Sequence, residues 1–555
     1  MRWLRFCCLL ICTAGLPVYA ASTPGKNAIA SAHPLATQAG MDILAAGGNA
    51  FDAAVAVTAA LAVVEPYSSG VGGGGFWLLH RASDGFQTMV DGRETAPAAA
   101  QRDMYLDKDG NVIADASMNG PLAAGIPGVP AAMVHLAQNY GKLPLAKTLA
   151  PAIQLAQQGF EVDAHYVRMA GFRLKAIQAS PEAARLFLKD NAVPAEGYII
   201  KQPELAATLQ TLADKGFDGF YKGEVAQKLV DGVRANGGIW QLKDLADYRV
   251  KERAPLRIQY RDMTITTAPP PSSGGVALAT MLNILEGYEL GSADGVTRKH
   301  LLVEAMRRAY RDRAIYLGDP DFVQVPVARL TDKNYAAGLR ASIRADKATA
   351  SSSLPGIDSA PGGFHTTHFS ILDQAGNRVS ATVTVNYPFG SGFVPPGTGV
   401  LLNDEMDDFS AKPGTPNAYG LVGAEANAIE PGKRPLSSMS PTFIDTADSV
   451  AVLGTPGGSR IITMVLLGIL DFADGHDPQS WVSQGRYHHQ YLPDEISYEE
   501  GALTEAEITS LRSLGHEVKQ NPWRYGNMHG ILWRKATGSV EAASDPRGVG
   551  QARVK

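Results

Sequence analysis

Residues 366–410 read TTHFSILDQAGNRVSATVTVNYPFGSGFVPPGTGVLLNDEMDDFS, and they contain the pattern that decides the fold. Two stretches rich in strand-forming residues, TTHFSILD and RVSATVTVN, are joined by QAGN at 374–377, which has the chemistry of a hairpin turn. We therefore predict two antiparallel strands that begin near Thr366. Residues 348–363 read ATASSSLPGIDSAPGG, and this crowding of Ser, Pro and Gly predicts a linker that ends where the first strand starts.

Helix and strand patterns alternate on the N-terminal side of this hairpin. Residues 34–60 predict two small-residue helices separated near Gly47, and residues 301–317 predict the clearest long helix. Residues 76–80 and 86–90 predict another strand pair. This mixture of helices and hairpins indicates an α+β protein.

The composition is that of a globular protein. The 555 residues are 45% hydrophobic and 19% charged, which is enough apolar material for a large core. The net charge of -5 arises from 50 basic and 55 acidic residues without long like-charge blocks. Nucleic-acid binding needs a concentrated basic surface, so we expect no nucleic-acid partner.

Residues 1–20 have the pattern of a secretory signal peptide. Two arginines precede an apolar run at 6–16, and Val18-Tyr19-Ala20 forms a small-x-small cleavage site. The run is about half the ~20 residues that a membrane helix needs, although an uncleaved anchor is the alternative. We expect a periplasmic or secreted protein with no membrane contact after signal removal. All three cysteines lie in this segment, so the mature protein would have none: Cys7, Cys8 and Cys12.

The glycine-rich run GVGGGG at 70–75 satisfies the spacing of a dinucleotide-binding motif. It is followed by the strand-like FWLL, where such a motif requires the start of a helix, and it lacks the Lys-Ser/Thr pair of a phosphate loop. We therefore predict only close packing of backbone at this run. The chain also contains no G-x-S-x-G, so it offers no serine-hydrolase elbow.

Residues 366–410 closely resemble the opening of the small subunit of gamma-glutamyltransferases. Further blocks resemble the same family in the same order, over roughly residues 25–550: VDGRETAP (90–97), GPLAAGIPGVP (120–130), PPPSSGG (269–275), YLGDPDF (316–322), FSAKPGTPNAYGLVG (409–423), KRPLSSMSPT (433–442) and GTPGGSRIIT (454–463). The resemblance implies the N-terminal nucleophile (Ntn) hydrolase fold, a four-layer αββα sandwich. It also implies a precursor that cuts itself between His365 and Thr366.

This cut would divide the precursor into a large subunit, residues 21–365 with a C-terminal linker at about 348–365, and a small subunit, residues 366–555, which together form a heterodimer. Just before the cut, Gly363-Phe364-His365 replaces the more polar stretch usual in the family. This departure bears on the rate of processing and not on the identity of the nucleophile.

Thr366 is the nucleophile that the resemblance implies. A threonine hydroxyl needs a base to accept its proton. At a chain terminus, the amino group of the same threonine can serve, because its pKa of about 7.7 to 8.0 leaves a useful neutral fraction near pH 7. Before the cut, the hydroxyl would attack the His365 carbonyl to form an ester that water opens. By resemblance, Thr384 orients the Thr366 hydroxyl.

A gamma-glutamyl substrate ends in a free amino acid, so its site must hold a carboxylate and an ammonium together. By resemblance, Arg93 would clamp the carboxylate, with Ser437 and Ser438 as hydroxyl partners. Glu405 and Asp408 would take the ammonium. The remaining roles implied by the family are a hydrogen bond from Asn386, an oxyanion hole from the backbone N–H groups of Gly457 and Gly458, and a lid from Tyr419.

The expected activity is removal of the gamma-glutamyl group from glutathione and related compounds, with transfer to water or to the amine of an amino acid or peptide. No cofactor or metal is expected. One alternative is an Ntn acylase that acts on glutaryl beta-lactams or on poly-gamma-glutamate. A glutaryl group has no ammonium for MDDFS to receive, and a polymer needs a more open cleft than a lid allows. The other alternative is an inactive secreted binding protein, which would have no reason to keep Thr366, Thr384, Gly457 and Gly458 together.

Overall fold

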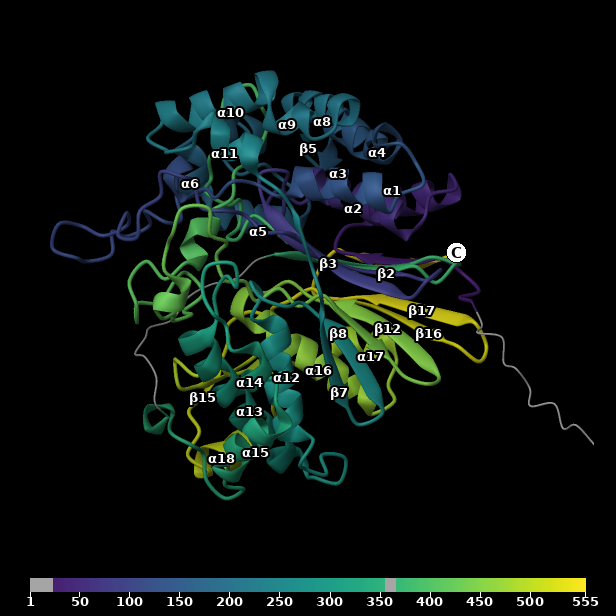
Figure 1. Ribbon diagram of the computed structural model, residues 1–555, viewed down its shortest axis with the longest axis vertical. Helices are drawn as coiled ribbons and strands as arrows, with labels where there is room; N and C mark the ends of the chain where they lie inside the picture. The colour runs from purple at the N-terminus through teal and green to yellow at the C-terminus, as the bar shows by residue number, and fades with distance from the viewer. Residues whose placement is uncertain (1–22, 355–365) are drawn as a thin grey trace, which may run out of the picture.

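The computed structural model describes residues 23–354 and 366–555, and its architecture is two antiparallel sheets stacked between layers of helices. Helices α1 to α4 and α8 to α11 cover the outer face of one sheet, and α12, α13 and α16 cover the other (Figure 1). The four-layer αββα sandwich that the resemblance implies is therefore confirmed.

The seven-stranded sheet has the order β18-β1-β9-β10-β2-β3-β6, and each neighbouring pair is antiparallel. Strands from both sides of the predicted cut are mixed in this sheet: β9 and β10 lie between β1 on one side and β2 on the other. The two parts of the chain therefore share one hydrogen-bonded unit. The bounds are β1 (Ala28–Ser31), β2 (Gly74–Arg81), β3 (Phe86–Gly92), β6 (Lys251–Arg253), β9 (Thr367–Leu372), β10 (Arg378–Thr384) and β18 (Gln551–Val554).

The six-stranded sheet has the order β17-β16-β12-β11-β8-β7 and packs face to face against the first. Hydrogen bonds also cross between the sheets, as from Ser380 Oγ to the Leu453 carbonyl at 3.1 Å. The bounds are β7 (Leu256–Tyr260), β8 (Met263–Thr267), β11 (Thr442–Asp445), β12 (Ser449–Gly454), β16 (His529–Arg534) and β17 (Ser539–Ser544). Two small sheets contain β4 (Phe160–Glu161), β5 (Ile199–Ile200), β13 (Tyr487–His488), β14 (Ile496–Tyr498) and β15 (Val518–Gln520).

The period-2 alternation of the strands separates two apolar layers. In β2, Trp77 and Leu79 join the core beneath the first helix layer, whereas Phe76 and Leu78 join the core between the sheets. Because both faces of the sheet are covered, its central strands are apolar on both sides. The helices of the first layer are α1 (Pro34–Ala45), α2 (Ala50–Val64), α3 (Val129–Asn139), α4 (Leu145–Gln158), α5 (Ala164–Phe172), α6 (Leu174–Gln178), α7 (Pro181–Phe187), α8 (Pro203–Lys215), α9 (Asp218–Tyr221), α10 (Gly223–Ala235) and α11 (Leu242–Asp247).

The second helix layer is built around α16, whose residues from Ile461 to Leu470 are all buried. Its helices are α12 (Gly274–Leu285), α13 (Gly295–Tyr316), α14 (Val327–Leu330), α15 (Lys333–Ala341), α16 (Ile461–Ala473), α17 (Pro478–Ser483) and α18 (Glu505–Ser513). Short 3-10 turns complete the described elements: η1 (Pro121–Ala123), η2 (Ser351–Ser353), η3 (Glu405–Asp408), η4 (Glu425–Asn427) and η5 (Gly458–Arg460).

The elements predicted from sequence are confirmed, with small shifts at their ends. The hairpin after the predicted linker is β9 and β10, and the second strand pair is β2 and β3. The long helix begins earlier than predicted, at Gly295, because the Asp294 side chain caps it through the N–H groups of Val296 and Thr297.

Two predicted segments fall wholly or partly outside the described residues. Of the predicted linker, residues 348–354 are described, and there the Ser351 N–H donates to Asp494 Oδ2 at 2.7 Å. The rest of the linker and the whole signal segment 1–20 lie outside the described residues. Within the described ranges, none of the helices combines the length and apolarity needed to span a bilayer.

Candidate active site

One pocket gathers side chains from both sides of the predicted cut. The residues that line it are Arg93, Thr366, Thr384, Asn386, Glu405, Asp408, Tyr419, Leu421, Ser437, Ser438, Met439, Gly458 and Ile461. Of the residues predicted from sequence, Gly457 lies next to this lining, and His365 lies outside the described residues. The remaining predicted residues are brought together here, although they span more than 340 positions of the chain.

The two threonines meet at the start of β9 and the end of β10. Thr366 Oγ1 and Thr384 Oγ1 are 3.3 Å apart, and both residues are buried. Thr384 Oγ1 also accepts the backbone N–H of Asn386 at 2.7 Å. Asn386 has φ +76°, a left-handed conformation that turns the chain sharply after the strand. The Thr384 hydroxyl is thus fixed on one side and faces Thr366 on the other.

The glycine-rich run at 70–75 packs closely against the end of β10, where Thr384 lies. A Cβ on Gly73 would lie 1.9 Å from the Thr384 carbonyl oxygen, and a Cβ on Gly72 would lie 2.1 Å from that of Leu401. A side chain on Gly73 would therefore displace the backbone that carries Thr384, and one on Gly72 would displace that of Leu401. The prediction that this run packs backbone closely is confirmed by these contacts.

Arg93 is completely buried and is held by acidic side chains. It forms an ion pair with Glu405 and a 2.5 Å ion pair with Asp408 Oδ2. Its Nε donates to the Pro435 carbonyl at 3.1 Å. The predicted carboxylate clamp and the predicted ammonium acceptors are therefore paired with each other in this structure. A zwitterionic ligand could exchange with these ion pairs, carboxylate for carboxylate and cation for cation.

Acidic groups outnumber the cation in this cluster. Burial, and then the nearby Asp408, raises the pKa of Glu405 to about 8, although Arg93 opposes the change. Burial also raises the pKa of Asp408 and, to a greater degree, that of Glu94, which lies beside Arg93. Three carboxyl groups this close together cannot all ionise without excess negative charge, so their raised pKa values keep protons on the cluster until a further cation enters. The pocket therefore favours a ligand that brings an ammonium.

Arg313 is a second buried arginine near the site, and sequence reasoning missed it. It extends from α13, with its Nε donating to Ser273 Oγ at 3.0 Å and its Nη2 to Ser438 Oγ at 3.4 Å. Ser273 in turn donates to the Ser437 carbonyl at 2.7 Å. The only signal in the sequence was that the long helix, α13, carries more charged residues than could all reach solvent. That pattern does not indicate which arginine contacts Ser438.

Gly457 and Gly458 adopt conformations that favour glycine, with φ of +143° and +56°. A Cβ on Gly458 would lie 2.4 Å from the Tyr419 ring, so the ring rests directly on this backbone. Tyr419 is 4% exposed, and its hydroxyl donates to the Asn386 carbonyl at 2.6 Å. Tyr419 is therefore a buried residue that contacts both the Gly457–Gly458 turn and Asn386, the second residue after Thr384.

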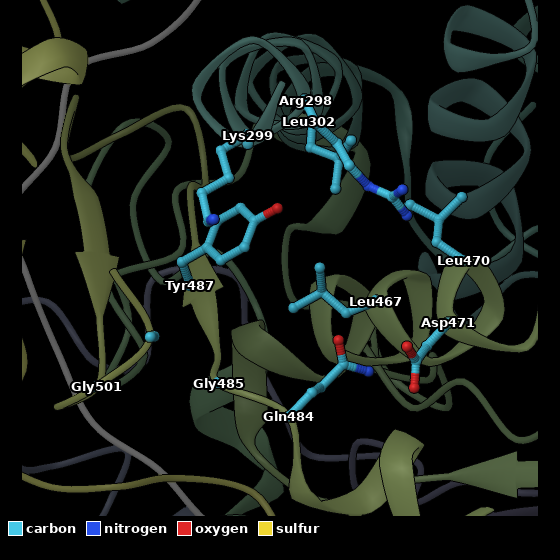
Figure 2. A pocket seen from close by; sticks show the side chains of 12 residues that line it. Arg298, Lys299, Leu302, Leu467, Leu470, Asp471, Gln484, Gly485, Tyr487 and Gly501 are labelled. Atoms are coloured by element: carbon cyan, nitrogen blue, oxygen red, sulfur yellow. The ribbon is translucent and has the colours of Figure 1, made fainter. Parts of the chain in front are cut away.

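A larger hollow of about 240 Å³ lies elsewhere, between α13 and α16 (Figure 2). None of the residues predicted for the site lines it. Arg298 pairs with Asp474 at 2.5 Å, and Lys299 pairs with Glu507. Both of these cations are already paired with carboxylates. We therefore choose the candidate site by the residues that line it and not by the volume of the hollow.

Among the described residues, the one cluster with metal-ligand spacing is His300, Glu304 and His516, all buried. His300 Nδ1 and His516 Nε2 are within hydrogen-bonding distance at 2.8 Å. Glu304 pairs with Arg308 at 2.7 Å and with Arg307 at 3.4 Å. Two guanidinium groups around the carboxylate oppose a dication there. This cluster is best described as a buried hydrogen-bonded network.

Comparison with known proteins gives a consistent result. The model of the gamma-glutamyltranspeptidase family matches residues 36–554. The glutathione hydrolase proenzyme of Pseudomonas sp. (strain A14) is 48% identical over 499 residues, covering 88% of this chain and 86% of that protein. Cephalosporin acylase from Bacillus halodurans has a TM-score of 0.83 at 28% identity, covering 98% of this chain and 99% of that chain. Helicobacter pylori gamma-glutamyltranspeptidase has a TM-score of 0.58 at 40% identity, covering 59% of this chain and 94% of that chain.

Proposed function

The chain belongs to the gamma-glutamyltranspeptidase family, and from that premise we propose that Thr366 is the nucleophile that cuts the precursor and then receives the gamma-glutamyl group. The protein is a gamma-glutamyltransferase and glutathione hydrolase with the Ntn-hydrolase fold. The observation that supports these residue roles best is the single pocket in which Thr366 lies with Arg93, Glu405 and Asp408.

Self-cleavage would use the geometry of the precursor. The Thr366 hydroxyl attacks the His365 carbonyl carbon, the peptide C–N bond breaks, and the Thr366 nitrogen leaves as an amine. Water then opens the resulting ester and restores the hydroxyl. Thr384 at 3.3 Å supports this role, because it can orient the attacking oxygen. The products would be residues 21–365 and 366–555. The Helicobacter pylori chain, which covers 59% of this chain with 94% of its own length, supports such a division.

Catalysis would repeat the same chemistry on a substrate. The new Thr366 amine accepts the hydroxyl proton while the oxygen attacks the gamma-carbonyl carbon. Negative charge that develops on the carbonyl oxygen would be stabilised by the N–H groups of Gly457 and Gly458. The amine of the leaving group departs, which gives a gamma-glutamyl ester on Thr366. Water, or the amine of an amino acid or peptide, then attacks this ester.

Substrate recognition would proceed by exchange of charges. The alpha-carboxylate of the substrate would take the place of acidic partners on Arg93, with help from Ser437 and Ser438. The alpha-ammonium would bind Glu405 and Asp408, with Asn386 nearby. The buried Tyr419 ring would exclude water from the acyl group. Each exchange replaces one buried ion pair with another, so the carboxylate and the ammonium of the bound substrate each have a partner of opposite charge.

Donor affinity should depend on pH through Glu405. Its pKa is raised to about 8, so the carboxylate that receives the ammonium becomes more populated as pH rises toward 8. We expect the inhibition constant of the product L-glutamate to fall about tenfold between pH 6 and pH 7. Competitive inhibition against gamma-glutamyl-p-nitroanilide measures it. Glu405→Gln should abolish this dependence, and a wild-type constant that does not change over this range would contradict the assignment.

An acylase acting on glutaryl side chains is the second candidate, favoured by the TM-score of 0.83 to the Bacillus halodurans cephalosporin acylase. The acidic excess around Arg93 argues against it, because a glutaryl group has a carboxylate but no ammonium. A depolymerase of poly-gamma-glutamate is opposed by the buried Tyr419 over the pocket. An inactive binding protein is opposed by the contact between Thr366 and Thr384.

Two chromogenic substrates separate these functions, because gamma-glutamyl- and glutaryl-p-nitroanilide differ only in the ammonium. We expect kcat/KM to be at least about a hundredfold higher for the gamma-glutamyl compound, since a buried carboxylate left unpaired costs about 3 kcal/mol or more. Added glycylglycine should increase nitroaniline release if the ester is passed to amines. Equal rates with both substrates would favour the acylase. Release that does not respond to glycylglycine would remove the transferase half of the activity.

We also propose that the chain is exported and loses residues 1–20. The basic start and the short apolar run before Ala20 support this. The N-terminal sequence of the large subunit, isolated from the producing cells, tests it. A start at residue 21 or 22 is expected, whereas retention of Met1 would indicate an anchor.

A further inference from the structure

Glu65 is a buried carboxyl group that the reaction described above does not use. It caps the C-terminal end of α2 and is 3% exposed. Its Oε2 accepts a hydrogen bond from Thr367 Oγ1 at 2.7 Å, and its Oε1 accepts a longer one from the Tyr67 hydroxyl at 3.4 Å. Burial raises its pKa to about 7, although the Thr367 hydroxyl opposes this change.

No cation within residues 23–354 and 366–555 forms an ion pair with Glu65. A carboxyl group buried without a cation lowers the stability of the fold. A residue of the same size that is wholly apolar would avoid that loss but could not accept a hydrogen bond. The contact that accounts for this group is therefore its short hydrogen bond to Thr367, the residue next to the nucleophile.

The segment that follows Glu65 also holds the other threonine of the site. The N–H groups of Ser68 and Ser69 donate to the Glu65 carbonyl at 2.8 and 3.0 Å, which closes a tight turn. The Ser68 carbonyl then accepts the Val385 N–H at 3.3 Å. The same segment leads to Gly73, whose backbone lies against the Thr384 carbonyl. Residues 65–73 thus contact β9 through the Glu65 side chain and contact the end of β10 through their backbone.

Thr366 lies between these two sets of contacts. It is one peptide bond from Thr367, and its hydroxyl is 3.3 Å from that of Thr384. Reaction at a fixed carbonyl is sensitive to displacements of about 1 Å, which can cost about a hundredfold in rate. The Glu65 hydrogen bond restrains Thr367, the first residue of β9, and thereby restrains the adjacent backbone that carries Thr366.

We propose that Glu65 is a positioning residue for self-cleavage, which acts by holding the Thr367 hydroxyl so that Thr366 Oγ1 stays aligned beside Thr384. This inference rests on the proposed role of Thr366 as the nucleophile. Glu65 accepts a hydrogen bond in either protonation state, so the role requires the acceptor atom and its position but not the charge.

Four single variants test the contact from both ends. Glu65→Ala removes the acceptor, and Thr367→Val removes the donor while keeping the shape of the side chain. We expect each to slow the appearance of the 366–555 chain by about ten- to a hundredfold, as followed by intact mass on folded, newly purified precursor. Glu65→Gln and Thr367→Ser keep the hydrogen bond and should process within about threefold of wild type.

Thr88→Val provides the matched control. Thr88 is a buried strand threonine in the same sheet, on β3, and its hydroxyl contacts Arg253. The same loss of a hydroxyl there should leave processing unchanged. Circular dichroism melting of every variant restricts the comparison to folded protein, and Thr367→Val alone suffices if Glu65→Ala does not fold.

The double variant Glu65→Ala/Thr367→Val decides whether the two groups act through each other. If they do, it should process no more slowly than the slower single variant, because one contact can be lost only once. Wild-type rates in both single variants, or effects that multiply in the double variant, would overturn the inference. Thr366→Ala tests the proposed nucleophile separately from the proposed role of Glu65. If this variant is still cut before residue 366, Thr366 is not the nucleophile, whatever the Glu65 variants show.

Discussion

Thr366→Ala should remain a single uncut chain and should lose activity by about 10⁵-fold or more, because the same hydroxyl serves both self-cleavage and transfer. Alanine removes the hydroxyl, and a chain that stays uncut never acquires the terminal amine that serves as base. Intact mass after incubation at neutral pH reads the first effect, and release of nitroaniline from the gamma-glutamyl substrate reads the second.

Thr366→Ser is the matched control for this variant. It keeps a hydroxyl at 366 and should yield two chains, the smaller beginning Ser-Thr-His-Phe. We expect it to be cut more slowly than wild type, because serine lacks the methyl group that restricts rotation of the side chain. Cleavage of Thr366→Ala at the same bond would exclude Thr366 as the nucleophile. An uncut wild-type precursor under folded conditions would indicate that Gly363-Phe364-His365 blocks processing, and would favour the inactive binding protein.

Arg93→Lys should give the second largest effect. Lysine keeps the charge but cannot reproduce the planar fork that contacts Glu405 and Asp408 together. We expect kcat/KM for the gamma-glutamyl donor to fall about a hundred- to a thousandfold, because breaking a buried charge pair costs about 3 to 5 kcal/mol. Most of the loss should appear in KM, since the contact binds the amino acid part of the substrate and not the reacting carbonyl.

Arg378→Lys separates loss of recognition from loss of stability. Arg378 is also buried and donates through Nη2 to both oxygens of Asp445, at 2.7 and 2.8 Å, but it lies outside the candidate pocket. Both variants should melt at lower temperature, whereas only Arg93→Lys should lose kcat/KM per folded molecule. An unchanged KM in Arg93→Lys would show that this arginine does not contact the substrate.

The local elements could be predicted because their signals are local. The β9–β10 hairpin follows from two strand-like stretches around a four-residue turn, and the break between α1 and α2 was predicted from Gly47. The structure adds that Asn49 and Asp52 form a capping box at the start of α2. The strand predicted after the glycine run at 70–75 is β2, which stands where a dinucleotide motif requires the start of a helix. The outer limits of α13 were missed, since Asp294 and not the apolar pattern sets its start.

The sequence by itself determined the identity of the candidate residues. The blocks around Thr366, Arg93 and Gly457 resemble one family in one order, and such motifs need no knowledge of distance. The blocks that resemble the family carry all of the residues that line the pocket. What they could not supply was the relation between residues in different blocks, because side-chain pattern along a strand or helix reports which face is buried but not what covers that face.

Only the tertiary structure decided which of these residues pair and what supports them. Arg93 follows β3, whereas Glu405 and Asp408 lie in η3, and only the fold brings these residues together from more than 300 positions apart. Arg313 reaches Ser438 from α13 in the second helix layer, and Glu65 reaches Thr367 from the end of α2 in the first. In each case a charge is buried where the local pattern predicts only a helix or a loop. The physical reason is that burial and charge pairing are set by packing between layers, which no short stretch of sequence contains.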